Sequence, residues 1–156
     1  MIFISHRGNI YGPNPQLENT EGYIEKAIKK YFVEIDVWKI KDSWWLGHDA
    51  PEQETSQGFI SQKGLLLHAK NLEAFKTMLD LELHCFWHQD DFYTLTSRGL
   101  IISYPGCASG NNVICMKPEL LSMDTIVDCY AICSDYVGMF KDVKSPNQGV
   151  GFNETR

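Results

Sequence analysis

Val33-Glu34-Ile35-Asp36-Val37 is a short stretch of β-branched residues that carries two carboxylates. β-Branched residues favour strands, in which alternate side chains point to opposite faces, so Glu34 and Asp36 share one face. Three other apolar runs end in polar groups in the same way, namely Ile4-Ser5-His6-Arg7-Gly8, Trp45-Leu46-Gly47-His48-Asp49 and Leu66-Leu67-His68-Ala69-Lys70. Because parallel strands present their carboxyl ends at one edge of a sheet, the four endings predict one shared site.

The rest of the chain predicts alternating strands, helices and loops. Strands are expected at 2–5, 32–38, 44–47, 65–69, 84–87, 100–104, 113–116 and 130–133, with a short extra strand at 92–96. A helix is expected to start at Thr20, another to run from Asn71 to Asp80, and a short one to begin at Pro118. Leu72, Phe75 and Leu79 should face the core from the second of these helices. The polar segment 50–63 predicts no strong helix.

These elements predict an α/β protein, a reduced (β/α)8 TIM-type barrel with several outer helices shortened or missing. A complete barrel typically needs about 250 residues, whereas this chain has 156. Residues 1–143 are expected to form one domain and 144–156 a loose C-terminal tail. Missing helices would expose apolar strand faces, which a homo-oligomer could cover.

Composition narrows the class of partner. The formal net charge is −6, with an isoelectric point near 5.3, which argues against duplex nucleic acid as the main partner. The apolar start, Met1 to Ile4, is too short for a signal peptide or a membrane span. The five cysteines are odd in number and include no CxxC pair, so we expect reduced thiols in a cytoplasmic protein and no zinc finger.

The strand-end residues suit phosphate chemistry, although each also has a simpler interpretation. Glu34 and Asp36 can chelate a hard cation such as Mg²⁺ or Ca²⁺, or can be the wet face of a half-buried strand. His6 and His48 have the ordinary pKa that acid–base catalysis at neutral pH requires, yet single strand-end histidines are usually structural. Arg7 suits a phosphate oxygen or a surface ion pair.

The order of these motifs resembles a known family. Ser5-His6-Arg7-Gly8, Leu17-Glu18-Asn19-Thr20, Glu34-Ile35-Asp36-Val37 and His48-Asp49 together resemble the N-terminal signature of the glycerophosphodiester phosphodiesterases. The match covers residues 4–49, continues more weakly to Lys70, and reappears in Ala131-Ile132-Cys133-Ser134-Asp135-Tyr136. The related phospholipase D toxins and phosphatidylinositol-specific phospholipases C share the barrel and the use of two histidines.

The resemblance implies hydrolysis of a small phosphodiester with a divalent cation. It implies His6 and His48 as the acid–base pair. It also implies substrate binding by Arg7 and Lys70, supported by Glu18 and Asn19, and a metal site at Glu34 and Asp36. The family usually places a third carboxylate ligand where this chain has His68. An imidazole there removes one negative charge and favours Mn²⁺ or Zn²⁺ over a harder ion.

Two other functions remain consistent with the sequence. A catalytically degenerate barrel could bind a sugar phosphate or a protein partner, in line with His68 and the short chain. A metal-independent lyase could use a carboxylate to orient an imidazole instead of holding a cation. The choice between water and a substrate hydroxyl as nucleophile is left open by the residues.

Overall fold

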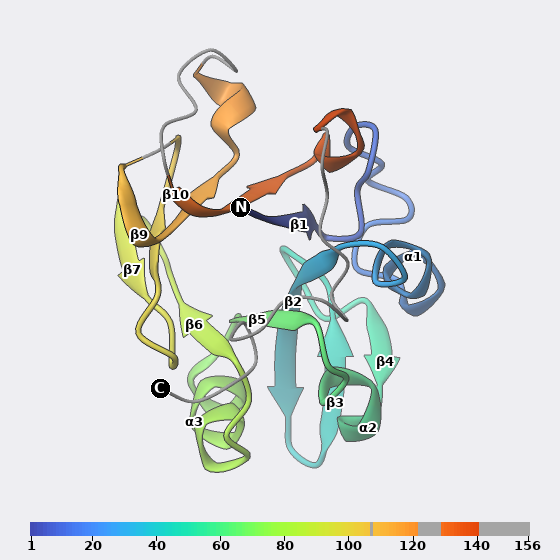
Figure 1. The fold of residues 1–156 in the computed structure, drawn as a ribbon. Coiled ribbons are helices and arrows are strands. Elements are labelled where there is room, and N and C mark those ends of the chain that lie inside the picture. Colours follow the sequence, from blue (N-terminus) through green and yellow to red (C-terminus); the bar gives the residue numbers. More distant parts are fainter. Residues whose placement is uncertain (107, 122–128, 141–156) are drawn as a thin grey trace.

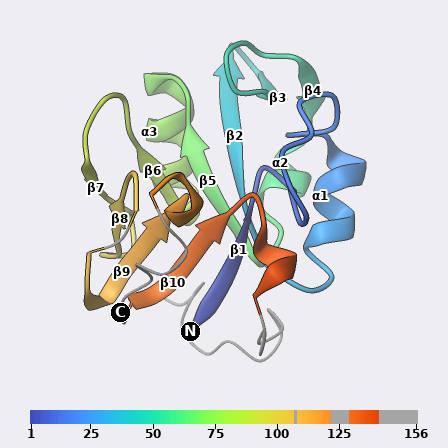
Figure 2. The ribbon, with the colours of Figure 1, turned by 90° about the horizontal axis from the view of Figure 1, so that it is seen from above.

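A computed structural model describes residues 1–106, 108–121 and 129–140 of the chain. Seven of the strands in these residues form a parallel sheet in the order β6-β5-β2-β1-β10-β9-β8. They are β1 (Ile2–His6), β2 (Phe32–Ile40), β5 (Leu65–Ala69), β6 (Cys85–Trp87), β8 (Ile101–Ser103), β9 (Gly110–Met116) and β10 (Cys129–Ser134). The sheet curves strongly (Figure 1), and its central strands point in one direction when seen from above (Figure 2).

Three antiparallel strands extend this sheet. β3 (Ser43–Leu46) folds back on β2, β4 (Gln53–Thr55) follows β3, and β7 (Tyr93–Leu95) pairs with β8. The described helices are short: α1 (Glu21–Ala27), α2 (Gln57–Ile60) and α3 (Leu72–Asp80), with 3₁₀ turns η1 (Pro118–Leu120) and η3 (Val137–Met139). β7 also lies beside β6, because the Thr94 hydroxyl donates to the Trp87 carbonyl at 2.6 Å.

The expectation of a reduced (β/α)8 barrel is wrong. The described residues form a mixed, strand-dominated half-barrel sheet of ten strands with three short helices, so strands and helices do not alternate. Residues 104–109 alone join β8 to its parallel neighbour β9, a connection shorter than the dozen or so residues that a helical crossover needs. The segments that form β3, β4 and β7 would form outer helices in a complete barrel. In the described residues β6 pairs with β5 alone, so the ladder is not closed.

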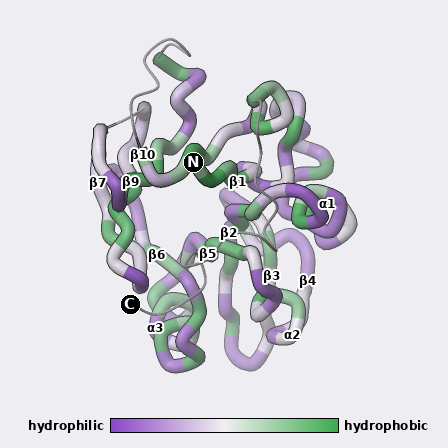
Figure 3. Tube along the Cα trace, viewed as in Figure 1, coloured by the Kyte–Doolittle hydropathy of each residue, from purple (hydrophilic) through white to green (hydrophobic). Residues whose placement is uncertain are grey.

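Alternate residues of the parallel strands face the inside of the curve. The interior cluster contains Ile4 from β1, Phe32 from β2 and Leu66 from β5, together with Ile114 and Cys133 from β9 and β10. The residues between these positions on β2 and β5 pack outward against α1, α2 and α3, whereas Phe3, Cys115 and Ile132 pack in a separate cluster with Val137. Figure 3 colours much of β1 and β5 as hydrophobic, in keeping with the burial of every residue of both strands. The interior columns of β1, β2 and β5 start with apolar residues and become polar toward the carboxyl ends of the strands.

The structure confirms some of the predictions about individual helices and segments and contradicts others. Asn71 caps α3, since its side chain accepts a hydrogen bond from the Ala74 amide. Leu72 and Leu79 are exposed, however, and Ala74 and Met78 form the buried face of that helix instead. The expectation for 50–63 also missed two short elements, β4 and α2, which are held by the hairpin with β3 and by a Ser56 cap rather than by intrinsic propensity.

The cysteines differ from the expectation of five free thiols. Cys115 is disulfide-bonded, whereas Cys85 and Cys133 are free, and Cys107 lies outside the described residues. Disulfides are more usual in oxidising compartments, so the cytoplasmic location stays a prediction. Within the described part of the chain no helix has the length and apolar character needed to cross a membrane. The expected tail, 144–156, also lies outside the described residues.

Candidate active site

The candidate site is formed by polar side chains of the interior columns, close to the carboxyl ends of the strands. His6 follows Ile4 on β1, Glu34 and Asp36 follow Phe32 on β2, and His68 follows Leu66 on β5, each at a spacing of two residues. Strand register aligns these columns, because His6 pairs with Glu34 and Asp36 pairs with His68. All four side chains are buried. The structure thus brings together four of the predicted site residues.

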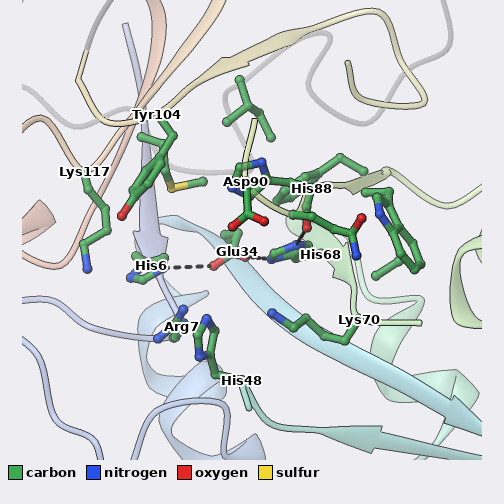
Figure 4. A pocket seen from close by; sticks show the side chains of 16 residues that line it. His6, Arg7, Glu34, His48, His68, Lys70, His88, Asp90, Tyr104 and Lys117 are labelled. Atoms are coloured by element: carbon green, nitrogen blue, oxygen red, sulfur yellow. Dashed lines mark hydrogen bonds and ion pairs between the residues drawn. The ribbon is translucent and has the colours of Figure 1, made fainter. Parts of the chain in front are cut away.

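Three of them, His6, Glu34 and His68, line one cavity of about 660 Å³. Figure 4 shows side chains from different strands converging on it. The predicted residues on its wall are His6, Arg7, Glu34, His48, His68 and Lys70. Others on the wall include His88, Asp90, Tyr104 and Lys117.

His6 is held by the carboxylate of Asp135, the residue that directly follows β10. Its Nδ1–H donates to Asp135 Oδ1 at 2.7 Å, and its Nε2 lies 3.8 Å from Glu34 Oε2. Asn9 Nδ2 donates to the same Asp135 oxygen at 2.8 Å, while Lys117 Nζ lies 2.9 Å from the other. Burial would raise the pKa of Asp135, but these hydrogen bonds outweigh it and hold that pKa well below its ordinary value. Asp135 is therefore an anion that fixes the tautomer and orientation of His6.

Glu34, Asp36 and His68 form a cluster suited to a cation. One ligand atom from each lies within 4.8 Å of the others. Glu34 Oε2 is buried and has no hydrogen-bond partner in the described residues, and burial together with the adjacent Asp36 raises the pKa of Glu34. The His88 carbonyl accepts from His68 Nε2–H at 3.2 Å, which leaves Nδ1 as the nitrogen facing the carboxylates. Two carboxylates and an oriented imidazole fit a divalent cation.

Asp36 is the most heavily partnered carboxylate of the site. Arg7 Nε lies 2.8 Å from its Oδ2, to which Asn19 Nδ2 also donates, while Lys70 Nζ lies 3.5 Å from Oδ1. Although burial opposes ionisation, the adjacent His68 imidazole and the positive charge of Arg7 hold the pKa of Asp36 far below its ordinary value. Asp36 therefore remains charged and places two cationic side chains at the cavity.

Glu18 and Asn19 lie behind the cavity wall. Glu18 Oε2 lies 3.3 Å from Arg7 Nη1, and its other oxygen accepts from Asn9. Asn19 donates to Asp36 and accepts from the Asp36 amide at 2.9 Å. Both predicted substrate-binding residues thus hold Arg7 and Asp36 in place, and neither belongs to the described lining of the cavity.

His48 enters the cavity from the loop after β3. Gly47, with φ of +144°, makes the turn, and its carbonyl accepts from Trp38 Nε1 at 2.7 Å. The His48 side chain is 42% exposed, and its Nδ1 lies 2.7 Å from Asp49 Oδ1. Burial, with further contributions from Arg7 and Lys70, lowers the pKa of His48 and favours the neutral imidazole.

The predicted site residues did not include Asp135, Lys117, His88 or Tyr104. Asp135 holds His6, and Glu119 Oε1 accepts from the Asp135 amide at 3.0 Å. The two-residue spacing of the interior columns identifies three of the missed residues, as continuations of Phe86 to His88, Ile102 to Tyr104 and Cys133 to Asp135. Lys117 breaks this spacing, because its backbone is left-handed at φ +50°.

Comparisons of the chain with protein-family models, with curated proteins and with solved structures found no match.

Proposed function

We propose that this protein is a metal-assisted phosphodiester hydrolase that acts on a small substrate in the manner of the glycerophosphodiester phosphodiesterases. The observation that carries the proposal is one cavity that unites an oriented histidine, a second histidine, two cationic side chains and a carboxylate–imidazole cluster. Because one fold hosts many activities, the proposal rests on this site and not on a barrel architecture.

Arg7 and Lys70 would bind the phosphodiester. Both line the cavity and both are anchored to the buried Asp36 carboxylate, at 2.8 Å and 3.5 Å. The Arg7 guanidinium offers several planar donors to non-bridging oxygens, and Lys70 adds a point charge. Their positions are set before substrate arrives, so the charge that develops in the transition state meets donors already in place.

Glu34, Asp36 and His68 would hold the divalent cation. When bound, such a cation polarises the phosphoryl group and offsets its negative charge. Glu34 gives the strongest reason to expect a cation, because no donor among the described residues bonds to its buried Oε2 and a second carboxylate lies beside it. Mg²⁺, Ca²⁺, Mn²⁺ and Zn²⁺ are all candidates, since the imidazole softens an otherwise hard ligand set.

The two histidines would move the protons. His48, which the surroundings favour in its neutral form, accepts a proton from the attacking water as the new P–O bond forms. His6, held by Asp135, donates a proton from Nε2 to the alcohol oxygen as the old P–O bond breaks. The products are a phosphomonoester and an alcohol, and a later proton exchange with solvent restores both imidazoles.

Phosphorus NMR tests this function directly. The purified protein would be incubated with glycerophosphodiesters in Mg²⁺, Ca²⁺, Mn²⁺, Zn²⁺ or a chelator, beside His48→Asn and an Asp91→Asn surface control. We expect a phosphomonoester with at least one cation, with no product in the chelator or the His48→Asn sample. Conversion that is unchanged in chelator would favour a metal-independent lyase. No conversion by folded protein under any condition would reject hydrolysis of these esters and favour a domain that binds a sugar phosphate.

A further inference from the structure

The cavity of the candidate active site carries two sets of cationic side chains, and each set is held by a different buried carboxylate. Arg7 and Lys70 are held by Asp36, at 2.8 Å and 3.5 Å. Lys117 is held by Asp135, with its Nζ 2.9 Å from Oδ2. All three cationic side chains line the cavity. The proposed function uses the first set for the scissile phosphate and gives Lys117 no contact with the substrate.

The two sets lie apart in the sheet. Asp36 belongs to β2, whereas Asp135 directly follows β10, and β1 lies between these two strands. Two strand spacings correspond to about 10 Å. Figure 4 shows Lys117 and Lys70 on opposite sides of His6. A ligand that engages both sets therefore needs a second acceptor group besides the scissile phosphate.

Lys117 has donors that its ion pair does not use. An ammonium group has three N–H donors, and the contact with Asp135 is the one ion pair that Lys117 makes in the described residues. The Lys117 side chain is 23% exposed and lines the cavity, so a ligand can reach the remaining donors. Tyr104 adds a hydroxyl to the same side of the cavity (Figure 4).

The backbone is strained where it places Lys117 at the cavity. Ile114 and Met116 belong to the interior column of β9, so an extended strand would turn the next residue outward. The backbone of Lys117 is instead left-handed, with φ +50° and ψ +54°, and its amide donates to the Cys133 carbonyl at 2.7 Å. A non-glycine residue in this region costs free energy, and such strain concentrates at functional sites.

The acidic side chains of this region leave the Lys117 side of the cavity open to an anion. Glu119 Oε1 accepts from the Asp135 amide, and Glu119 does not belong to the described lining of the cavity. Asp90, which comes after β6, places a negative charge on another part of the wall. A second anionic group of a ligand is therefore favoured beside Lys117 and disfavoured beside Asp90.

We propose that Lys117 binds an anionic group of the alcohol that leaves at His6, so that the substrates are phosphodiesters of acidic alcohols. The inference rests on the proposed function, because it takes the phosphate to lie at Arg7 and Lys70. Asp135 contacts both His6 and Lys117, at 2.7 Å and 2.9 Å, so the anionic group lies only a few atoms from the ester oxygen. A carboxylate and a second phosphate share the chemistry that the Lys117 ammonium recognises.

Binding of three matched esters of glycerol phosphate tests this assignment. Their alcohols have similar lengths and end in a carboxamide, a carboxylate or a phosphonate. Each ester would be titrated by calorimetry into the His48→Asn variant, with the cation that supports turnover or with Mg²⁺ if none does. We expect at least one anionic ester to bind about 10-fold more tightly than the carboxamide ester, because a charge is added to the acceptor. Equal affinities for the three esters would overturn the assignment.

Variants of Lys117 then separate substrate binding from a purely structural role. Lys117→Gln keeps a donor for Asp135 but removes the positive charge, so it should abolish the preference for the anionic esters and leave the affinity for the carboxamide ester unchanged. Lys117→Arg should retain the preference. Lys76→Gln, at an exposed lysine of α3, is the matched control and should change neither affinity. A preference that survives in Lys117→Gln would overturn the assignment.

Chemical labelling provides a test that needs no substitution at Lys117. The His48→Asn variant would be treated with acetic anhydride in the presence of a saturating ester, and acetylation of each lysine would be followed by mass spectrometry. The preferred anionic ester should slow acetylation of Lys117 more than the carboxamide ester does, while Lys76 reacts equally with both. Equal acetylation of Lys117 with the two esters would contradict a direct contact.

Turnover of the same esters by the unmodified protein distinguishes the two proposals. Hydrolysis of all three esters with equal kcat and equal KM would overturn the role of Lys117 and leave the proposed function standing. A preference that Lys117→Gln removes, without turnover of any ester, would keep the contact with Lys117 and overturn the hydrolase. No binding of any ester would overturn both proposals.

Discussion

The imidazole of His6 donates to the carboxylate of Asp135 across 2.7 Å, although 129 positions separate the two residues in the chain. β1 and β10 are parallel neighbours, with Ser5 opposite Ser134, and this pairing brings their carboxyl ends together. The contact leaves Nε2 of His6 directed toward the cavity, where a proton can be transferred. Orientation of a histidine by a buried carboxylate is common in enzymes that use it for proton transfer.

Replacement of Asp135 by asparagine should therefore impair proton transfer more than binding. The amide offers a donor or a weaker acceptor to Nδ1, so His6 loses its fixed tautomer. We expect kcat to fall by about 10²- to 10⁴-fold with a small change in KM. Rates would be followed by phosphorus NMR, and the His6 tautomer by nitrogen shifts. Asp91→Asn is the control, and an unchanged kcat for Asp135→Asn would remove the orienting role.

Asp135 should also make the stability of the protein depend on pH. Its pKa is lowered in the folded state, whereas the unfolded chain titrates near the ordinary value of about 3.9. The stabilisation is thus present above about pH 4 and is lost as the pH falls toward the folded pKa. The free energy of unfolding would be measured in urea between pH 7 and pH 2.5. At neutral pH the gap in this free energy between the native chain and Asp135→Asn should be on the order of 2 kcal/mol. That gap should shrink below about pH 4, and a constant gap would contradict the assignment.

The metal cluster predicts the effect of restoring a carboxylate at position 68. His68→Asp should tighten Mg²⁺ or Ca²⁺ binding by about 10-fold, because these ions prefer oxygen ligands and an added negative charge. Without metal the same variant should melt at a lower temperature, since three carboxylates would then crowd one buried site. His88→Asp is the matched control, as it lies on the same cavity wall outside the cluster. The affinity for Mg²⁺ or Ca²⁺ would be measured by calorimetry. Equal affinities in the native chain, His68→Asp and His88→Asp would show that His68 is not a metal ligand.

Arg7 should not tolerate lysine, even though the charge is kept. Arg7 Nε and Nη1 reach Asp36 and Glu18 at 2.8 Å and 3.3 Å, and a single ammonium cannot span both carboxylates in the same way. We expect Arg7→Lys to lower the free energy of unfolding by about 1–3 kcal/mol. The guanidinium of Arg98 donates to the Glu82 carbonyl and serves as the comparison. Arg98→Lys should lower the free energy of unfolding, measured in urea, by less than Arg7→Lys does. The reverse order would show that the Arg7 bridge has little structural value.

Short-range patterns predicted the strands and the polar strand ends well. The alternation in Val33-Glu34-Ile35-Asp36-Val37 gave the shared face of Glu34 and Asp36, and parallel pairing then brought His6 and His68 beside them. These features depend on a two-residue period and on one general property of parallel strands. Both can be recognised in a single sequence.

The architecture and the outer residues of the site depend on long-range packing. A count of strands did not reveal that β3 and β7 run antiparallel or that residues 104–109 join parallel neighbours without a helix. The role of Asp135 could not be predicted, because only the pairing of β1 with β10 shows what its carboxylate faces. No sequence pattern predicts where the Lys117 side chain points, since its direction is set by a left-handed backbone angle.

The central position of β2 links chemistry to the fidelity of folding. β2 pairs with β1, β3 and β5, and its Glu34 and Asp36 occupy the interior at fixed register against His6 and His68. A slip of one residue would turn both carboxylates toward the apolar cluster beneath the helices and would bring Val33 and Ile35 inward. Misaligned chains would therefore bury two unpaired charges, so the two carboxylates of the candidate site also disfavour the wrong strand alignment.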